Sequence, residues 1–220
     1  MDDRRLSGLV LPVTSIRDVA KALMRGLALV CVVPSLASFA CRAPLIGRDR
    51  ALEGSTQLLA LFPGLLGQYL RRAFLSRVLA SCDKTATICF GTTFSQVAAR
   101  IDARSYVGPG CVLGRVHVEC DVLIASGVQI TSGRQTHGVS DPTVAIRDQQ
   151  GMKTLVRIGE GSWIGAAAVI MADVGRGCVI GAGSVVTNPI PDWVVAAGVP
   201  ARVIRSRVDS TEPPPGLASA

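Results

Sequence analysis

A histidine in a polar segment is the residue of this chain best suited to proton transfer. His137 stands in the segment GRQTHG, residues 133–138, inside a stretch that cannot be divided into the six-residue units found on either side of it. We expect that stretch to loop out of the fold, where functional groups tend to lie. A neutral imidazole accepts a proton from a hydroxyl group near pH 7, so we predict that His137 is a general base. Asp141 either orients the imidazole or belongs to a Ser-Asp-Pro turn.

The other histidine and the cysteines are weaker candidates for a catalytic or metal-binding role. His117 lies in VHVE, within the repeats, and we expect it to be a solvated residue on the face of a coil. Two histidines exclude a three-histidine zinc site within one chain, and no other residues have metal-ligand spacing, so no metal is predicted. Seven cysteines without a Cys-x-x-Cys pair favour a reducing compartment over a disulfide framework.

Six-residue units must position the loop that carries His137. They read IDARSY, VGPGCV, VECDVL and IASGVQ from residue 101, then IGEGSW, IGAAAV, VGRGCV and IGAGSV from residue 158. Each begins with an aliphatic residue and carries a small one fifth, with Gly or Asp expected to take the turn. Three units make a triangular rung, and rungs stack as parallel strands, so the pattern predicts a mainly β solenoid. Cys111 and Cys178 fall at the small position and are predicted to be core residues.

One unit departs from this spacing. VGRGCV begins four residues after Ile170, which shortens one face of one rung and leaves the register near Asp173 open.

The chain resembles the hexapeptide-repeat acyltransferases, most closely members associated with polysaccharide biosynthesis. The resemblance covers residues 85–207 and is carried by IGEGSWIGAAAVI (158–170), IGAGSVVTNPIP (180–191) and AAGVPARVIR (196–205). It implies a left-handed parallel β-helix, a homotrimer and the use of acetyl-CoA. The left hand follows from the resemblance alone, because parallel crossovers are as a rule right-handed.

The resemblance also implies roles for single residues. It places the catalytic histidine at His137 and lays Trp163 beside the pantetheine arm of CoA, with the backbone of Ala166 nearby. Arg202 and Arg205 match basic residues at the nucleotide end, where cations meet phosphates. Because the family's groove lies between two chains, half of the site is expected from a neighbouring copy. Further residues matched along the groove are Ala182, Thr187 and Asn188, although a lysine is common at the last position.

The N-terminal third carries the excess of positive charge. Residues 1–84 contain 12 Lys and Arg against 6 Asp and Glu, whereas residues 85–220 contain 11 against 10. Two uncharged runs, residues 26–40 and 54–70, have a proline near the middle and basic residues on both sides; each is shorter than the ~20 residues of a spanning helix. We expect helices that lie in one leaflet of a membrane and return to the same side. The flanking basic residues are Lys21, Arg25, Arg42, Arg48, Arg50, Arg71 and Arg72.

The same runs have other interpretations. They could be buried helices of a small soluble domain or a helical collar between subunits. A cleaved signal peptide is disfavoured by Asp2 and Asp3, and a lipoprotein cleavage box ending at Cys41 is discounted. The basic residues flank apolar runs without polar or aromatic interleaving, so a membrane surface fits better than nucleic acid.

These observations predict three parts: a helical, membrane-associated region over residues 1–84, an acyltransferase domain over 85–207 with a protruding loop at 133–157, and a disordered tail over 208–220. The expected reaction is O-acetylation of a sugar, free or lipid-linked, in an exopolysaccharide or lipopolysaccharide precursor, in the cytoplasm or at the cytoplasmic face of the inner membrane of a bacterium. The alternatives are an N-acetyltransferase acting on an amino sugar and a non-catalytic scaffold tethered to the membrane. A γ-type carbonic anhydrase is excluded by the histidine count.

Overall fold

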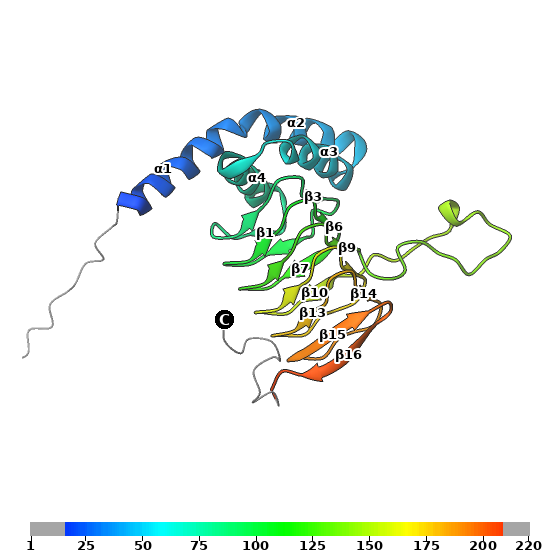
Figure 1. The fold of residues 1–220 in the computed structure, drawn as a ribbon. Helices are drawn as coiled ribbons and strands as arrows, with labels where there is room; N and C mark the ends of the chain where they lie inside the picture. The colour runs from blue at the N-terminus through cyan, green and yellow to red at the C-terminus, as the bar shows by residue number, and fades with distance from the viewer. Residues whose placement is uncertain (1–15, 209–220) are drawn as a thin grey trace, which may run out of the picture.

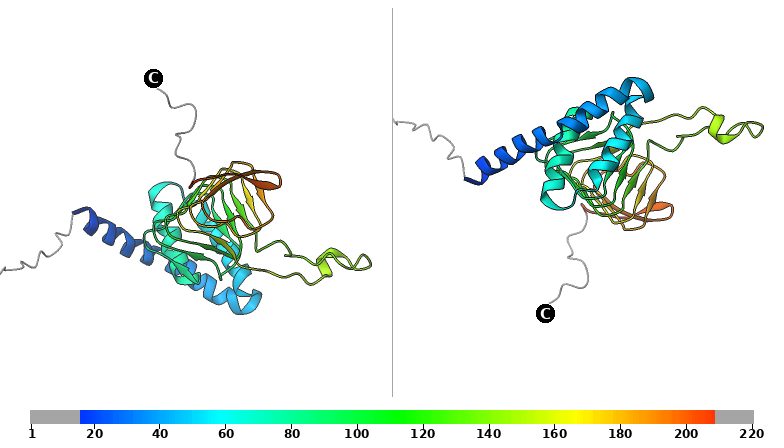
Figure 2. Two further views of the ribbon diagram at one scale, coloured as in Figure 1. Left: turned by 90° about the horizontal axis from the view of Figure 1, so that it is seen from below. Right: turned by 90° about the horizontal axis from the view of Figure 1, so that it is seen from above.

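A computed structural model describes residues 16–208, which form a cap of helices on one end of a stack of coils (Figure 1). A long loop stands away from the side of the stack in every view (Figures 1 and 2). The tail predicted over residues 208–220 lies outside the described residues from position 209 onward.

The coils are triangular, and almost every strand has two or three residues. Successive coils pair in parallel within three sheets, as the six-residue spacing predicts, and the solenoid is therefore a parallel β-helix. Among the strands of residues 16–208, only β16 runs antiparallel to its neighbour, β15, and it closes the stack. Sheet A contains β1 (Ser81–Cys82), β4 (Arg100–Ile101), β7 (Val116–Val118) and β10 (Val156–Ile158); sheet B contains β2 (Thr87–Ile88), β5 (Tyr106–Val107), β8 (Leu123–Ile124), β11 (Trp163–Ile164), β13 (Val179–Ile180), β15 (Val194–Gly198) and β16 (Ala201–Ser206); sheet C contains β3 (Thr93–Phe94), β6 (Val112–Leu113), β9 (Gln129–Ile130), β12 (Val169–Ile170) and β14 (Val185–Val186).

The interior of the solenoid holds the residues that the repeat predicts. The first, aliphatic residue of all eight predicted units is buried, and so is the fifth, small residue. Cys111 and Cys178 occupy this fifth position, and burial raises the pKa of both thiols. Their interpretation as core residues is confirmed.

The turns agree with the expectation in most units. Positive φ occurs at the fourth position, where six of the eight residues are Gly or Asp; the exceptions are Arg104 and Ala167, with φ of 58° and 56°. The second position is glycine for a different reason, close approach between coils: a Cβ at Gly108 would lie 2.7 Å from the carbonyl carbon of Ala125. Glycine at the second position therefore lets neighbouring coils approach closely, whereas the fourth position adopts the positive φ of the turn.

The solenoid begins earlier than the sequence boundary at residue 85. Strand β1 at Ser81 pairs with β4, and β2 and β3 complete a first coil. Its large buried residues Ile88 and Phe94 keep the six-residue spacing, but a phenylalanine replaces the usual aliphatic residue at the second position of the pair.

The short face near Asp173 keeps its register. Val174 forms single bridges with Ile158 and Ile190 in place of a strand, and Asp173 Oδ1 accepts a hydrogen bond of 2.8 Å from Arg157 N. The corner between sheets C and A is therefore two residues shorter in this coil, while the strands on either side of it stay in register.

Four helices form the cap: α1 (Ile16–Cys31), α2 (Val33–Ile46), α3 (Arg48–Ala60) and α4 (Gly64–Val78). Pro34 lies in the first turn of α2, and Pro63 precedes α4, so both prolines mark helix boundaries. Helices α3 and α4 pack on the first coil. The run at residues 54–70 is therefore divided between two helices, each with one side buried against the solenoid.

Arg71 corrects the picture of basic residues flanking a membrane segment. Its side chain is buried, with Nε donating to Ile88 O and Nη1 to Leu59 O and Phe62 O at 2.7–3.1 Å. Burial lowers the pKa of this guanidinium. Arg71 thus joins the end of α3 to the first coil and is unavailable to lipid.

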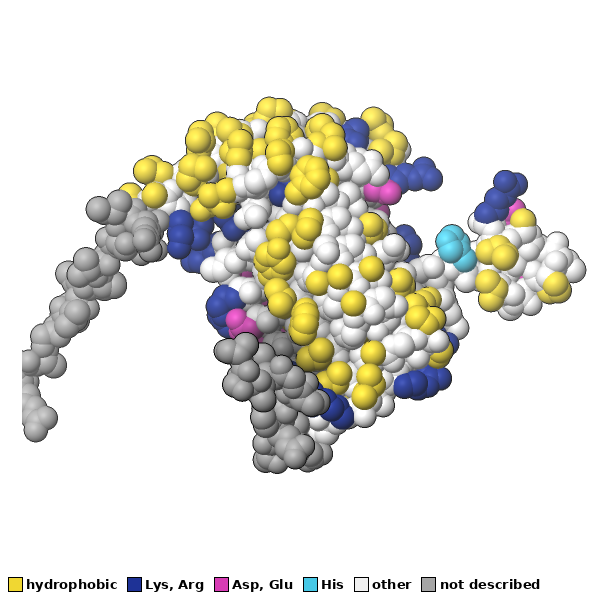
Figure 3. Space-filling view, in the orientation of Figure 1, with side chains coloured by type: hydrophobic (Ala, Val, Ile, Leu, Met, Phe, Trp, Pro, Cys, Tyr) yellow, Lys and Arg dark blue, Asp and Glu magenta, His cyan; other side chains and the backbone are white. Residues whose placement is uncertain are grey.

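The outer side of the cap is apolar (Figure 3). None of the described helices alone is long and apolar enough to cross a membrane; Val19–Cys31 and Val33–Ile46, bent by 44° at their junction, meet the criterion only as a pair. The exposed apolar side chains of the cap are Val19, Leu23, Leu27, Val30, Val33, Leu45, Ile46, Leu58, Leu61, Phe62, Leu65 and Leu66.

Candidate active site

The loop that carries His137 leaves the solenoid after β9 and returns at β10. It ends at residue 155, two residues before the predicted boundary, because Val156 and Arg157 already pair with β7. Its root is fixed by hydrogen bonds from Thr154 N to Ser132 O at 2.9 Å and from Met152 N to Gln135 O at 2.6 Å. The two arms of the loop therefore start side by side.

The two arms of the loop also lie close together beside His137. A Cβ on Gly151 would lie 2.1 Å from Thr136 O and 2.6 Å from His137 N, so this position accepts glycine only. The His137 side chain is exposed and makes no hydrogen bond or ion pair with any described residue. The backbone of His137 is thus held in place, while its imidazole ring has no partner among the described residues.

Asp141 does not orient His137. Its Oδ1 accepts hydrogen bonds from Thr143 N at 2.8 Å and Thr143 Oγ1 at 2.6 Å, which lower the pKa of this carboxyl. Of the two interpretations of Asp141, the structure shows the turn.

A cavity of about 450 Å3 lies on the cap side of the loop root. Helix α3 closes one wall with Asp49, Arg50 and Glu53, and sheet C supplies the floor. Thr136, which directly precedes His137, belongs to the lining. Carboxylates, cations, amides and hydroxyls together suit a ligand with many hydroxyl groups. The remaining lining residues are Ser95, Gln96, Val112, Gly114, Gln129, Ile130, Thr131, Ser132 and Lys153.

A second cavity, of about 550 Å3, lies on the opposite side of the same root. Its lining includes Arg134 and Gln135 from the loop, with Asp173 and Pro189 from the later coils. Arg134 Nη1 donates to Asn188 Oδ1 at 3.0 Å, which ties the loop to these coils. The loop root, with His137 just beyond it, thus separates two cavities of ligand size.

The sequence of the chain matches a known protein family and several known proteins. The family described as bacterial transferase hexapeptide (six repeats) matches residues 156–188. Over 143 residues the chain is 36% identical to WbbJ, a putative lipopolysaccharide biosynthesis O-acetyl transferase of Escherichia coli K12, which covers 54% of this chain and 71% of that protein. The chain belongs to the hexapeptide-repeat transferases.

Two further comparisons concern parts of the chain. It is 42% identical over 78 residues to a probable acetyltransferase, Rv3034c, of Mycobacterium tuberculosis H37Rv, which covers 34% of this chain and 26% of that protein. The chain thus spans about a quarter of the length of this curated relative. A galactoside acetyltransferase solved in complex with coenzyme A superposes with a TM-score of 0.54 and 24% identity, covering 72% of this chain and 80% of that one, which shows a common fold.

Within this hexapeptide-repeat transferase, the residues predicted to hold CoA fall into two groups. Thr187 and Asn188 lie at the corner between sheets C and A, beside the loop root. Ala166 and Ala182 occupy successive turns between sheets B and C, since Gly183 N donates to Ala166 O at 2.8 Å. Within one chain, the structure brings only the first group to the loop. The second group comprises Trp163, Ala166, Ala182, Arg202 and Arg205.

Sheet B joins Trp163 to Arg205 through a ladder whose ends are exposed and whose middle residues, Val179 and Val195, are half-buried. In register along successive strands stand Leu123, Trp163, Val179, Val195 and Arg205. Trp163 is 49% exposed, and the exposed Arg205 side chain donates a hydrogen bond of 3.3 Å from Nη1 to the neighbouring carbonyl of Ser206. An apolar strip that ends in a cation is a suitable surface for a pantetheine arm with a phosphate end.

His117 differs from its prediction as a solvated residue. It lies in β7 with only 16% of its side chain exposed, and its Nε2 lies 2.8 Å from Asp102 Oδ2. The pairing joins adjacent coils, because residue 102 follows β4 directly and β4 pairs with β7. His117 is therefore a covered residue of sheet A with a carboxylate partner.

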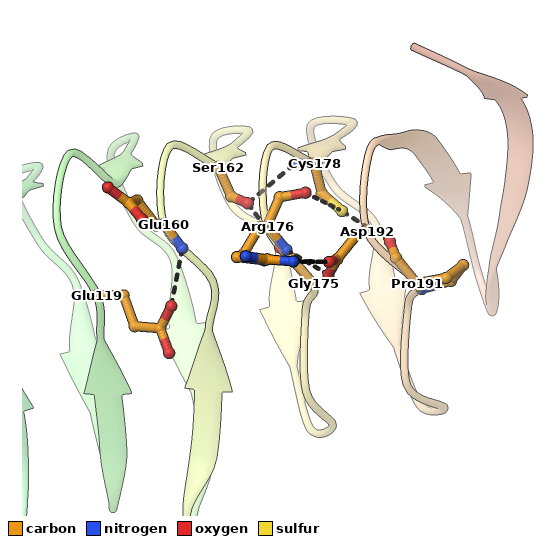
Figure 4. A network of polar contacts seen from close by, with 8 residues as sticks. All are labelled: Glu119, Glu160, Ser162, Gly175, Arg176, Cys178, Pro191 and Asp192. Carbon is orange, nitrogen blue, oxygen red and sulfur yellow. Dashed lines mark hydrogen bonds and ion pairs between the residues drawn. The ribbon is translucent and has the colours of Figure 1, made fainter. Parts of the chain in front are cut away.

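Polar contacts continue along this side of the hexapeptide coils (Figure 4). Glu119 Oε2 accepts from Glu160 N, and Arg176 donates twice to Asp192 Oδ2. Ser162 Oγ donates to Gly175 O and accepts from Cys178 N. These bonds connect one coil to the next, so the network holds the stack together. Among residues 16–208 no three His, Cys, Asp or Glu side chains gather as a metal site.

The part that α3 takes in the cap-side cavity has no signal in the sequence. Asp49, Arg50 and Glu53 are far along the chain from the loop and belong to no motif. Only the packing of α3 on the first coil brings them opposite Lys153 and Thr136.

Proposed function

We propose that this protein is an acetyl-CoA-dependent O-acetyltransferase that acetylates a sugar hydroxyl in an exopolysaccharide or lipopolysaccharide precursor. The observation that carries the proposal is the 36% identity with the putative lipopolysaccharide O-acetyl transferase, of which the chain covers 71%. A scaffold would require neither a fixed loop nor cavities on both sides of it. Catalysis accounts for both features.

In the proposed reaction the sugar binds in the cap-side cavity and the thioester approaches from the opposite side of the loop root. His137 takes the proton of the acceptor hydroxyl as its oxygen attacks the thioester carbon. A backbone N–H stabilises the oxyanion of the tetrahedral intermediate. As the C–S bond breaks, the CoA thiolate leaves and receives the proton from the imidazolium. Acetyl passes directly to the sugar, and no acyl-enzyme forms.

The cap-side cavity supports a sugar as acceptor. Arg50 and Lys153 are able to donate hydrogen bonds to a ligand, Asp49 and Glu53 are able to accept them, and hydroxyl and amide groups can do both. Sugar hydroxyls are donors and acceptors at once, so such a mixture matches them better than it matches an apolar or purely anionic acceptor.

CoA binding requires the two groups of predicted residues to meet. We propose a homotrimer of left-handed coils in which sheet B of one copy, with Trp163 and Arg205, faces the loop-side corner of the next, with Thr187 and Asn188. The neighbour would then complete the groove that a single chain leaves open. The exposed Leu123 and Trp163 on the ladder of sheet B support this arrangement, since exposed apolar surface favours a partner.

We further propose that the cap adsorbs to the cytoplasmic face of the inner membrane. Its exposed apolar side and the basic residues around it fit an interfacial helix pair. The paired substitutions Leu23→Gln and Leu27→Gln are expected to move most of the protein from the membrane to the supernatant fraction after ultracentrifugation. Equal distribution of the variant and the wild type would rule out this surface.

The reaction is tested with full-length protein, acetyl-CoA labelled in its acetyl group and a glycolipid pool from membranes. We expect mass spectrometry to show glycolipids heavier by one labelled acetyl group. Release of the label by mild alkali indicates an ester on oxygen; resistance indicates an amide and an amino-sugar acceptor. Absence of labelled product from lipid-linked and soluble glycans alike contradicts the proposal.

A further inference from the structure

Positive charge converges in a small cleft between the cap and the first coil. Arg25 of α1, Arg72 of α4 and Lys84 of the turn after β1 line a cavity of about 140 Å3. No carboxylate belongs to the lining, whose other members are Leu29, Tyr69, Ala73, Ser76 and Cys82. Figure 3 shows Lys and Arg side chains gathered beneath the first helix.

Two of the three cations, Arg25 and Lys84, keep side-chain hydrogen-bond donors without a partner in residues 16–208. The Arg25 Nε atom is buried and has no hydrogen-bond partner, a rare condition for a buried donor. The ammonium group of Lys84 makes no hydrogen bond or ion pair with the residues that the structure describes, although its charge lowers the pKa of the adjacent Asp83. Its neighbour Asp83 is occupied, since Oδ1 accepts from both Thr85 N and Thr85 Oγ1 at 2.6–2.7 Å.

Arg72 is the fixed member of the cluster. Its guanidinium lies 4.7 Å from the centre of the Tyr69 ring, and Nη1 donates to Ala86 O at 3.0 Å. One cation is thus held rigidly, and the donors left on the other two face the same space.

We propose that this cleft binds a phosphate group, carried by an anionic lipid or by a soluble phosphorylated compound. Three cations without a lining carboxylate require an anion, and guanidinium groups match phosphate oxygens in geometry. At about 140 Å3 the cavity is below the ~300 Å3 of ordinary small-molecule pockets, so it admits a head group and excludes a nucleotide or sugar. It shares no lining residue with the cavities at the loop root, and the proposal is therefore independent of the transferase reaction.

The test uses the full-length chain and two variants of equal net charge. Arg25→Gln with Lys84→Gln removes two cations from the cleft. Arg77→Gln with Arg100→Gln removes two exposed cations that lie outside the cleft. Each protein is melted with inorganic phosphate or with chloride at equal ionic strength, and is floated with phosphatidylcholine vesicles that contain or lack phosphatidic acid.

We expect at least one phosphate source to bind the wild type and the outer control alike, and to bind the cleft variant at least tenfold more weakly. A phosphate-dependent rise in melting temperature assigns the site to a free anion; flotation that depends on phosphatidic acid alone assigns it to a lipid. If the two variants behave identically in both assays, or if neither source binds the wild type, the proposal is wrong.

Discussion

The two histidines of this chain lie in regions with opposite physical demands. His117 sits in strand β7, where the register of the coils places Asp102 2.8 Å from its Nε2. His137 sits on the loop, exposed and without a partner among the described residues. A covered, paired imidazole contributes to folding, whereas an exposed, unpaired one is available to a substrate. The coils therefore supply rigidity, and the loop supplies the reactive group.

The largest loss of activity is expected from a substitution at the loop root, which tests whether the loop positions the reactive group. Gly133 has φ +88°, and an added Cβ would lie 1.9 Å from Thr154 Oγ1. Gly133→Ala is expected to shift the root by about 1 Å and to lower kcat about a hundredfold, because catalytic geometry tolerates little displacement. Steady-state acetyl-transfer kinetics measure this effect.

Gly127→Ala is the matched control on the coils. Gly127 has φ +69° but meets no atom closer than 3.9 Å, so alanine there costs about 1–2 kcal/mol of stability and leaves kcat unchanged. Equal losses of kcat in both variants would show that the loop root has no special role.

A smaller effect is expected on the ladder of sheet B. Trp163→Ala should raise KM for acetyl-CoA about tenfold with little change in kcat, since ~1.4 kcal/mol of ring contact is lost. Trp193 is equally exposed, at 49%, but lies in a turn beside Gly177, so Trp193→Ala should not change this KM. If KM for acetyl-CoA stays unchanged in the Trp163→Ala variant, the ladder is not the donor surface.

The smallest effect concerns the acid stability of the coils. A hydrogen bond of 2.8 Å from Arg157 holds the pKa of Glu119 below its ordinary value. The unfolded chain then binds more protons, so this contribution to the free energy of unfolding is present above about pH 5 and is lost as the pH falls through the folded-state pKa.

Urea unfolding between about pH 5 and pH 3 checks this expectation. The wild type should lose more stability over this interval than Glu119→Gln, while other paired carboxylates contribute equally to both proteins. If the free energy of unfolding falls equally with pH in the two proteins, Glu119 does not contribute to the acid stability of the coils.

The coils could be predicted from the sequence because the constraint on them is local. An inward aliphatic residue and a small residue four places later, as in Ile158 and Ser162, satisfy one corner of one rung whatever lies elsewhere. The first coil could not be recognised from this pattern, because Phe94 replaces an aliphatic residue and the cap covers one end of the coil.

The surroundings of the two histidines could not be predicted in the same way. Asp102 and His117 are 15 residues apart, and only the register of β4 and β7 brings them together. The wall that α3 gives to the cap-side cavity depends likewise on the packing of a separate helix. Such contacts follow from the assembled fold and leave no local spacing to read.

The most direct test of the account compares acetyl transfer by His137→Ala and His117→Ala, each measured well below its own unfolding temperature. We predict that His137→Ala keeps the wild-type melting temperature and loses at least ~100-fold in turnover, as expected when a general base is removed. His117→Ala should lose about 1 kcal/mol of stability, because its hydrogen bond to the partly exposed Asp102 carboxylate is removed, and should keep near-normal turnover. Near-normal turnover in folded His137→Ala, or a loss confined to His117→Ala, would contradict the assignment of the loop histidine as the base.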